Sequence, residues 1–436
     1  MSDRRNPAVH AANRRSRWWG VATVLAALGV AASACGTSSA SATSVASHSN
    51  RQVLIGAPLP LTGVGAGFGV PQLHAAEIEA DYINAHGGIK DLGGAKIKLV
   101  VADDQSSASV GTQLLKQMAS QGVSAFIGPV LSSVLASNVP VIQALRVPLF
   151  TPAGDSSVTD NNAGYIFRTI LRASGWVSDL GSYLKSLETS ANAPIKRVAI
   201  VDVSLQPGPS VQSAFESVAQ ANGWQTQVDS YPETTADFSP LVAKLAAFHP
   251  QVVVGYQDPN DAVQFAKAVV QQSWRPSYGF AWIFGGEDLN SFKAALGTPV
   301  NGWLDAAYTA GLSSARYPAS VRQIAAEYAK KYGQPLNGNQ GSLAAIVGVV
   351  ADAVSAAHST NPVKVAAAAK RLSFSSPAGS AYPFPQAGGV RFDANLDNQA
   401  FVPPIIQLEG TTANPTQVVV SPSDLSTGKV DWPVGG

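Results

Sequence analysis

The stretch that decides the fold is residues 53–88, which read VLIGAPLPLTGVGAGFGVPQLHAAEIEADYINAHGG. The apolar run 53–56 is typical of a buried strand. Within 71–85, apolar residues recur at the spacing of one helical face, at Leu73, Ala76, Ala80 and Ile83. The run His86-Gly87-Gly88 then ends the helix. These residues therefore predict one complete unit of a strand followed by a helix.

The same alternation continues along the chain and restarts after Arg168. In the first series we expect strands at 97–102, 123–128 and 147–151, and helices at 110–120 and 132–145, the latter bent at Pro140. In the second series we expect helices at 175–187, 210–221, 239–248 and 259–272, and strands at 198–202, 225–230 and 252–256. Further helices are expected near 321–332 and 343–358. Strands separated by helices predict parallel sheets covered on both faces, and two series predict two α/β lobes.

Bulk composition argues against several classes of function. The chain has 436 residues, with 29 Lys+Arg against 28 Asp+Glu and only 13% charged residues, so no basic face is available for nucleic acid. No nucleophile elbow, phosphate-binding Walker loop or His-Glu-x-x-His motif occurs, and the six histidines are scattered. We therefore expect no enzyme, no cofactor and no metal site, and the adjacent carboxylates Asp103-Asp104 point to opposite faces of a strand.

The N-terminal region has the layout of an export signal. Several arginines precede an apolar run at 18–30, and the small residues 31–34 lead to Cys35, the chain's one cysteine. We expect a signal peptide over 1–35. Residues 36–50 are nearly all Ser, Ala, Thr and Gly, which predicts a flexible tether. The pair Arg14-Arg15 is a weak sign of twin-arginine export.

A set of short motifs, in order and at consistent spacing, resembles one family. They are IGAPLPLTG at 55–63, INAHGGI at 83–89, VADDQS at 101–106 and FIGP at 126–129, followed by YIFRT at 165–169, YAKKYG at 328–333 and VRFD at 390–393. Together they resemble the leucine/isoleucine/valine-binding type of periplasmic binding protein, the type I fold used by branched-chain amino-acid ABC transporters.

The resemblance implies an architecture and a role. It implies two Rossmann-like lobes joined by a hinge that the chain crosses three times, with lobe I formed by 51–169 plus about 305–375 and lobe II by 170–304 plus about 376–436. It implies a Venus-flytrap protein that binds a small polar molecule, such as an amino acid or amide, and delivers it to ABC permease subunits. A ligand-sensing receptor of the same fold is the alternative, and a catalytic role is not implied.

The residues around Cys35 resemble a bacterial lipobox. The run Ala32-Ser33-Ala34-Cys35-Gly36 departs from that pattern at Ala32, where the family usually has Leu. The resemblance implies a lipid on Cys35 and a protein anchored to the outer face of the cell membrane. The alternative is an ordinary cleavage site beside an incidental cysteine.

The resemblance also assigns ligand-binding residues. Ser132 and Ser133 begin a helix whose unpaired N–H groups favour a carboxylate, although a serine N-cap would look the same. Glu287 aligns with the acid that pairs with a ligand ammonium, unless it is a solvated loop residue. Phe68 and Tyr256 fall where the family has aromatic walls, and core packing is the alternative for each.

The loop after the strand at 147–151 departs from the amino-acid-binding pattern. There Ala153 is followed by Gly154-Asp155 in place of a small residue and Thr, and a second acid beside a carboxylate would repel it. Pro207-Gly208 also replaces an aromatic-Gly pair. Asp155 either reads the ligand from the cleft or caps a short helix starting at Ser156 and points away from the cleft.

Overall fold

The structure is a computed structural model of the whole chain. It describes residues 52–160, 164–283, 292, 295–308, 310, 312, 315, 317–336, 340–374, 389–411, 413 and 415–433. All of these residues belong to one compact unit, His48–Gly436.

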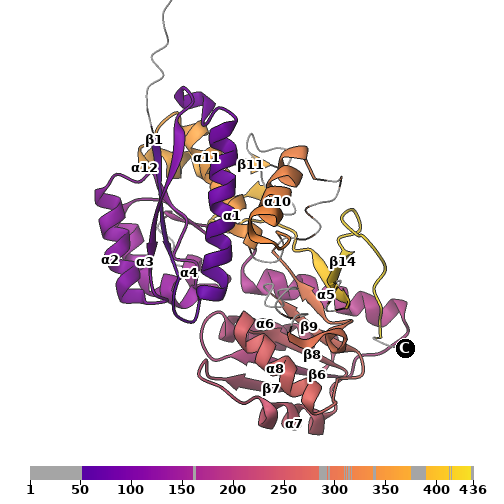
Figure 1. The fold of residues 1–436 in the computed structure, drawn as a ribbon. Helices are drawn as coiled ribbons and strands as arrows, with labels where there is room; N and C mark the ends of the chain where they lie inside the picture. The colour runs from indigo at the N-terminus through magenta and orange to yellow at the C-terminus, as the bar shows by residue number, and fades with distance from the viewer. Residues whose placement is uncertain are drawn as a thin grey trace, which may run out of the picture. The chain divides into compact units, whose positions relative to one another are not determined.

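The first half of the chain forms a five-stranded parallel sheet in the order β2-β1-β3-β4-β5 (Figure 1). Its strands are β1 (Gln52–Leu59), β2 (Lys96–Asp103), β3 (Ala125–Phe126), β4 (Leu149–Thr151) and β5 (Ile166–Arg168). The helices between them are α1 (Ala66–Ala85), α2 (Ala108–Ser120), α3 (Ser132–Leu145) and α4 (Ser157–Asp160), with a short 3-10 turn at Lys90–Leu92. We call this sheet and the helices packed on it lobe I. The alternation expected from the sequence is confirmed here.

A second, seven-stranded sheet has the order β14-β13-β10-β9-β8-β6-β7. Its strands are β6 (Arg197–Val203), β7 (Gln225–Tyr231), β8 (Val252–Tyr256), β9 (Gly279–Ile283), β10 (Leu304–Ala306), β13 (Ile405–Gly410) and β14 (Pro415–Ser421). Its helices are α5 (Ala173–Ser190), α6 (Gly208–Asn222), α7 (Ser239–Phe248) and α8 (Pro259–Gln271), and a 3-10 turn lies at Thr298–Val300. We call this sheet and its helices lobe II.

The edge of the second sheet differs from a purely parallel arrangement. β13 runs antiparallel to β10, and β14 runs antiparallel to β13. β13 and β14 follow each other closely in the chain, and a short connection between paired strands leaves only the antiparallel direction. The other neighbouring strands of this sheet are parallel, as expected.

The chain passes between the two sheets three times. After β10 it returns to lobe I as α10 (Ala319–Tyr332), α11 (Gln340–Ala357) and α12 (Pro362–Ala369). The orange α11 lies along the indigo α1, although the two are far apart in sequence (Figure 1). The short strands β11 (Ser373–Phe374) and β12 (Val390–Arg391) precede the last passage to β13. The exact lobe boundaries given above remain a prediction.

α11 forms the apolar centre of lobe I. It is the one helix of the described residues long and apolar enough to cross a membrane by length and composition, and 89% of it is buried inside the fold. Its buried side chains, such as Ile346 and Val350, share one core with Ile55 of β1 and Phe150 of β4. The helix is therefore packed as a core helix.

α1 begins five residues earlier than the sequence predicts. Pro71, the first residue of the helix predicted at 71–85, lies inside the helix, which starts at Ala66. A Cβ on Gly69 would lie 2.2 Å from the carbonyl oxygen of Pro60, so only glycine lets this first turn approach the loop after β1 so closely. The early start places Phe68 on the helix.

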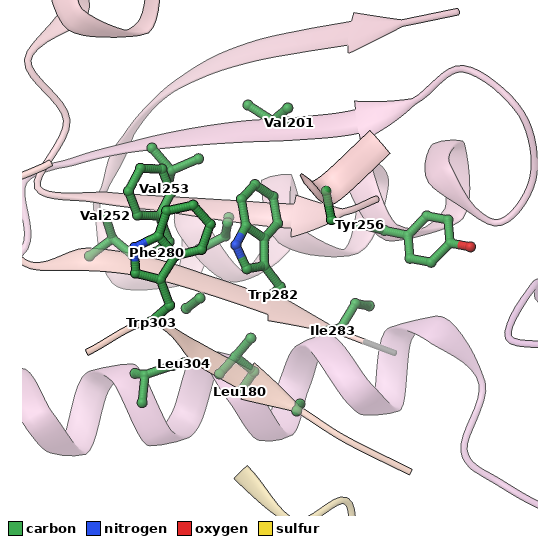
Figure 2. Close-up of a cluster of buried hydrophobic side chains, with 14 of the residues drawn as sticks. Leu180, Val201, Val252, Val253, Tyr256, Phe280, Trp282, Ile283, Trp303 and Leu304 are labelled. Carbon is green, nitrogen blue, oxygen red and sulfur yellow. The ribbon is translucent and has the colours of Figure 1, made fainter. Parts of the chain in front are cut away.

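Aromatic side chains fill the core of lobe II. The rings of Phe280 and Trp303 are stacked 4.0 Å apart, and Phe265 meets Trp282 edge-on at 5.6 Å. Figure 2 shows this cluster on the sheet, with the ring of Tyr256 extending away from it beyond the end of β8. Tyr256 is therefore directed differently from the aromatic residues of the core.

A buried ion pair joins two of the three passages between the lobes. Arg168, at the end of β5, donates from Nε to Oδ1 of Asp397 at 2.7 Å, and neither side chain is exposed. Arg172, just before α5, donates from Nη2 to the other oxygen of Asp397 at 2.6 Å. Asn398 adds a bond from Nδ2 to the carbonyl oxygen of Thr169 at 2.9 Å. Segments more than 200 residues apart are thus tied together.

Candidate ligand-binding site

A cavity lies where the two sheets present the carboxyl ends of their strands. Its empty volume is about 590 Å³, part of which is open to solvent. Loops after β1, β3, β4, β6, β7, β8 and β10 all contribute. The lining residues are Val64, Gly65, Phe68, Gln72, Val130, Leu131, Ser132, Ser133, Pro152, Ala153, Gly154, Gln206, Pro207, Glu233, Tyr256, Asp258 and Tyr308. Open α/β sheets bind ligands at this edge, so this cavity is the candidate site for a small molecule.

The N-terminus of α3 borders the cavity on the lobe I side. Ser132 and Ser133 both line it, and their role in ligand binding remains a prediction. The helix is preceded by Leu131, and the first intrahelical bond runs from Leu135 N–H to Leu131 O at 2.9 Å, so Ser132 is not the N-cap residue. The first amides of a helix have no partner within it, and this end carries partial positive charge. This wall therefore favours an anionic or electron-rich group.

Phe68 and Ala153 of lobe I, which were both expected at the site, also line the cavity. Phe68 lines it and is 7% exposed, and Gln72, one turn further along α1, lines it too. Ala153 lies after β4, and its N–H donates to Oγ1 of Thr151 at 3.0 Å. Apolar and amide groups therefore line the lobe I side of the cavity together with the N-terminus of α3.

Asp155 lies outside the cavity lining. It has no exposed surface, and its Oδ1 accepts from the N–H of Ser157, the first residue of α4, at 2.9 Å. Its Oδ2 accepts from Oγ of Ser210 in α6 at 2.6 Å. Its backbone N–H donates to Oγ of Ser132 at 3.3 Å. The carboxylate thus caps the start of a short helix, which is the arrangement that the sequence left open as an alternative.

Lobe II supplies acidic and phenolic groups. Tyr256 donates from its hydroxyl to Oδ1 of Asp258, and both residues line the cavity with Glu233 and Tyr308. Burial raises the pKa of Asp258 to about 6, because the hydrogen bond from Tyr256 opposes this shift only partly and Glu233 adds to it. Burial also raises the pKa of the Glu233 carboxyl. Asp261, one turn along α8, has a pKa raised to about 7 by burial and by Asp258.

The charges of the two walls are complementary. Among the lining residues that the structure describes, Glu233 and Asp258 are the carboxylates, and none is a lysine, arginine or histidine. A carboxylate wall opposite the positive end of α3 matches a molecule with a cationic group at one end and an anionic or polar group at the other.

The cavity lining includes residues that the sequence did not suggest as ligand-binding residues, among them Gln206, Glu233, Asp258 and Tyr308. Asp258 immediately precedes the helix predicted at 259–272 and holds its N-cap position, but its side chain makes no capping bond there and accepts from Tyr256. Glu233 and Tyr308 were not singled out, although each follows a strand on the side where ligands bind. Gln206 lines the cavity from the turn that leads into α6. A Cβ on Gly208 would lie 1.8 Å from the carbonyl oxygen of Val203, so glycine permits this tight turn.

Two predicted residues lie outside the described part of the chain. Glu287, expected to pair with an ammonium group, falls within 284–291, and Cys35 falls within 1–51. Both assignments remain predictions. Within the described ranges, no group of three or more His, Cys, Asp or Glu side chains is placed to hold a metal ion.

Known proteins match most of this chain in sequence or in fold. A leucine/isoleucine/valine-binding protein homologue of Brucella melitensis is 28% identical over 357 residues, covering 80% of this chain and 86% of the relative. The isoleucine complex of the branched-chain amino-acid-binding protein LivJ from Streptococcus pneumoniae superimposes with a TM-score of 0.68 at 18% identity, covering 85% of this chain and 100% of that one. A solute-binding protein of an ABC transporter from Rhodopseudomonas palustris, solved with 3,4-dihydroxybenzoic acid, gives 0.69 at 20% identity, with coverages of 84% and 96%.

The family model described as periplasmic binding protein matches residues 52–399. That range includes lobe I, lobe II apart from β13 and β14, the ion pair between their connections and every described residue that lines the cavity. The chain belongs to the periplasmic binding protein family, and its two α/β lobes have the type I fold.

Proposed function

We propose that this protein is the extracytoplasmic solute-binding component of an ABC importer and takes up a small polar solute that carries an amine. The observation that carries the proposal is the cavity between strand ends, with the N-terminus of α3 on one side and Glu233 and Asp258 on the other. Relatives named for leucine, isoleucine and valine binding support an amino acid or a related solute. A protein of this fold was solved with 3,4-dihydroxybenzoic acid, so solutes other than amino acids also have to be tested.

A thermal-shift screen of amino acids, amides, diamines, polyols and small carboxylates tests this proposal. A solute that binds the folded protein at a hundred times its dissociation constant stabilises it by about 2.7 kcal/mol, which is readily detected. We expect amine-bearing compounds to raise the melting temperature. A screen in which only compounds without an amine do so contradicts the proposed solute class.

Binding of an amine-bearing solute should weaken as the pH falls. The pKa of Asp258 is raised to about 6, mainly by burial, so its carboxylate becomes protonated as the pH drops through that value. A charge-assisted hydrogen bond contributes about 1.5–3 kcal/mol, but about a tenth of the carboxylate is still ionised at pH 5, so affinity there should be up to about tenfold below that at pH 7.5. Calorimetry at both pH values measures the change.

Asp258→Asn provides the control for this pH dependence. The variant should bind weakly at both pH values, with a smaller difference between them, because the amide does not titrate in this range. A wild-type affinity that is the same at pH 5 and pH 7.5 contradicts a role for the acidic wall in binding the solute.

We also propose that a lipid on Cys35 anchors the protein to the outer face of the membrane, where it meets the permease subunits. The support is the lipobox-like run before the chain's one cysteine. Cys35→Ser should give a folded protein that fractionates away from membranes. A variant that stays membrane-bound after its signal peptide is removed rules out the lipid anchor.

The alternative function for this fold is a ligand-sensing receptor that reports to a membrane partner other than a permease. Co-purification of the protein with permease subunits in the presence of the screened solute distinguishes the two.

A further inference from the structure

Asp155 occupies a fully buried position between two hollows of the molecule. Gly154 lines the cavity described above, and Ser156 lines a second, more open groove of about 730 Å³ on the other side. Asp155 itself lines neither and has no exposed surface. Gln206 of lobe II lines both hollows, so the segment around Asp155 lies at the partition between them.

The carboxylate of Asp155 joins the two lobes. On the lobe I side, Oδ1 accepts from the N–H of Ser157 at 2.9 Å and also from its hydroxyl. On the lobe II side, Oδ2 accepts from the hydroxyl of Ser210 at 2.6 Å. Ser210 is the third residue of α6, so the negative charge sits at the positive end of that helix. Both oxygens are therefore occupied by protein groups.

The backbone of the same loop is fixed to the connection between the lobes. Arg168 donates from Nη2 to the carbonyl oxygen of Asp155 at 2.6 Å and from Nη1 to that of Ala153. Arg168 is in turn held by its buried ion pair with Asp397. The loop is thus held in place by the connection, and its one charged side chain reaches across to α6.

We infer that Asp155 and Ser210 form a latch that stabilises the closed arrangement of the lobes without touching the solute. A charged acceptor and a hydroxyl at 2.6 Å form a half-buried bond, which exists only when α6 lies against the loop after β4. The role of the two residues is to hold the lobes in position. It does not depend on which solute binds, because the pair lies outside the cavity lining.

The test compares Ser210→Ala with Ser157→Ala in the full-length protein without added solute. Each variant removes one serine hydroxyl that donates to Asp155, but only Ser210 lies in the opposite lobe. Nitroxide labels at Gln121→Cys and Ala247→Cys, two exposed positions in lobes I and II, report the lobe separation by pulsed electron resonance in a Cys35→Ser background.

We expect the wild type to populate a short and a long separation. Ser210→Ala should lower the ratio of short to long by about tenfold, since a bond to a charged group is lost. Ser157→Ala should leave the ratio unchanged, and Ser210→Thr, which keeps the hydroxyl, should retain it. Circular dichroism confirms that each variant is folded.

Identical separations in the wild type and Ser210→Ala overturn the latch, as does an equal loss in Ser157→Ala. No solute enters this experiment. Failure of the latch is therefore distinguishable from failure of the proposed function, which the thermal-shift screen decides.

Discussion

Asp397→Asn is expected to destabilise the protein by about 3–5 kcal/mol, because it leaves the guanidinium of Arg168 buried without its counter-charge. Neither partner has exposed surface, and the same carboxylate also accepts from Arg172 and from the hydroxyl of Thr159. Urea denaturation followed by tryptophan fluorescence measures the change. The loss should be accompanied by a change in lobe separation, since the pair joins two connections between the lobes.

Asp160→Asn is the matched control. Asp160 also pairs with Arg172, but its side chain is 48% exposed, and exposed ion pairs contribute only about 0–1 kcal/mol. Burial opposes ionisation of Asp397, but Arg168 and Arg172 hold its pKa below the ordinary 3.8. Its contribution is therefore present above about pH 4 and is lost as the pH falls through the lower, folded-state pKa. Equal, small effects of the two substitutions would contradict this account of the ion pair.

The order of strands and helices was predictable because each strand is a short apolar run and each helix repeats at its own period. The structure differs from this prediction where tertiary contacts determine where an element begins or whether it forms. α1 begins at Ala66 and not at Pro71, since Gly69 allows the helix to pack on Pro60. The antiparallel pair β13 and β14 lies in the Pro/Gly-rich C-terminal part, where the periodicity gave no strand.

The candidate site was predictable in its position but not in all of its chemistry. Phe68, Ser132, Ser133, Ala153 and Tyr256 meet at one cavity because strand ends in parallel sheets share an edge. The direction of a side chain is not encoded in local spacing. The pair Asp258-Pro259 gives the same helix-start pattern whether the carboxylate caps the helix or turns to Tyr256. The bond from Asp155 to Ser210 joins residues 55 apart, which no local pattern reports.

Tyr256→Ala is expected to reduce affinity for the screened solute by roughly thirtyfold or more, since losing a central aromatic wall typically costs at least about 2 kcal/mol. The ring extends away from the lobe II core beyond the end of β8 and lines the cavity (Figure 2). Its removal also leaves Asp258 without its hydroxyl donor. Isothermal calorimetry measures the loss, and thermal unfolding shows that the fold survives.

Tyr256→Phe separates the two contributions of this residue. It keeps the ring and removes the hydroxyl that donates to Asp258, so the loss of affinity should be smaller than in Tyr256→Ala. An affinity that is unchanged in both variants would show that Tyr256 is only a packing residue at the edge of the core.

The most direct test of solute binding by closure is small-angle X-ray scattering of the protein with and without a saturating solute from the screen. The binding groups lie on both lobes, at the N-terminus of α3 and at Glu233, Tyr256 and Asp258, so the solute is buried only when the lobes approach. We expect the radius of gyration to fall when the solute is added. A radius of gyration that is the same in both states would contradict solute binding by closure.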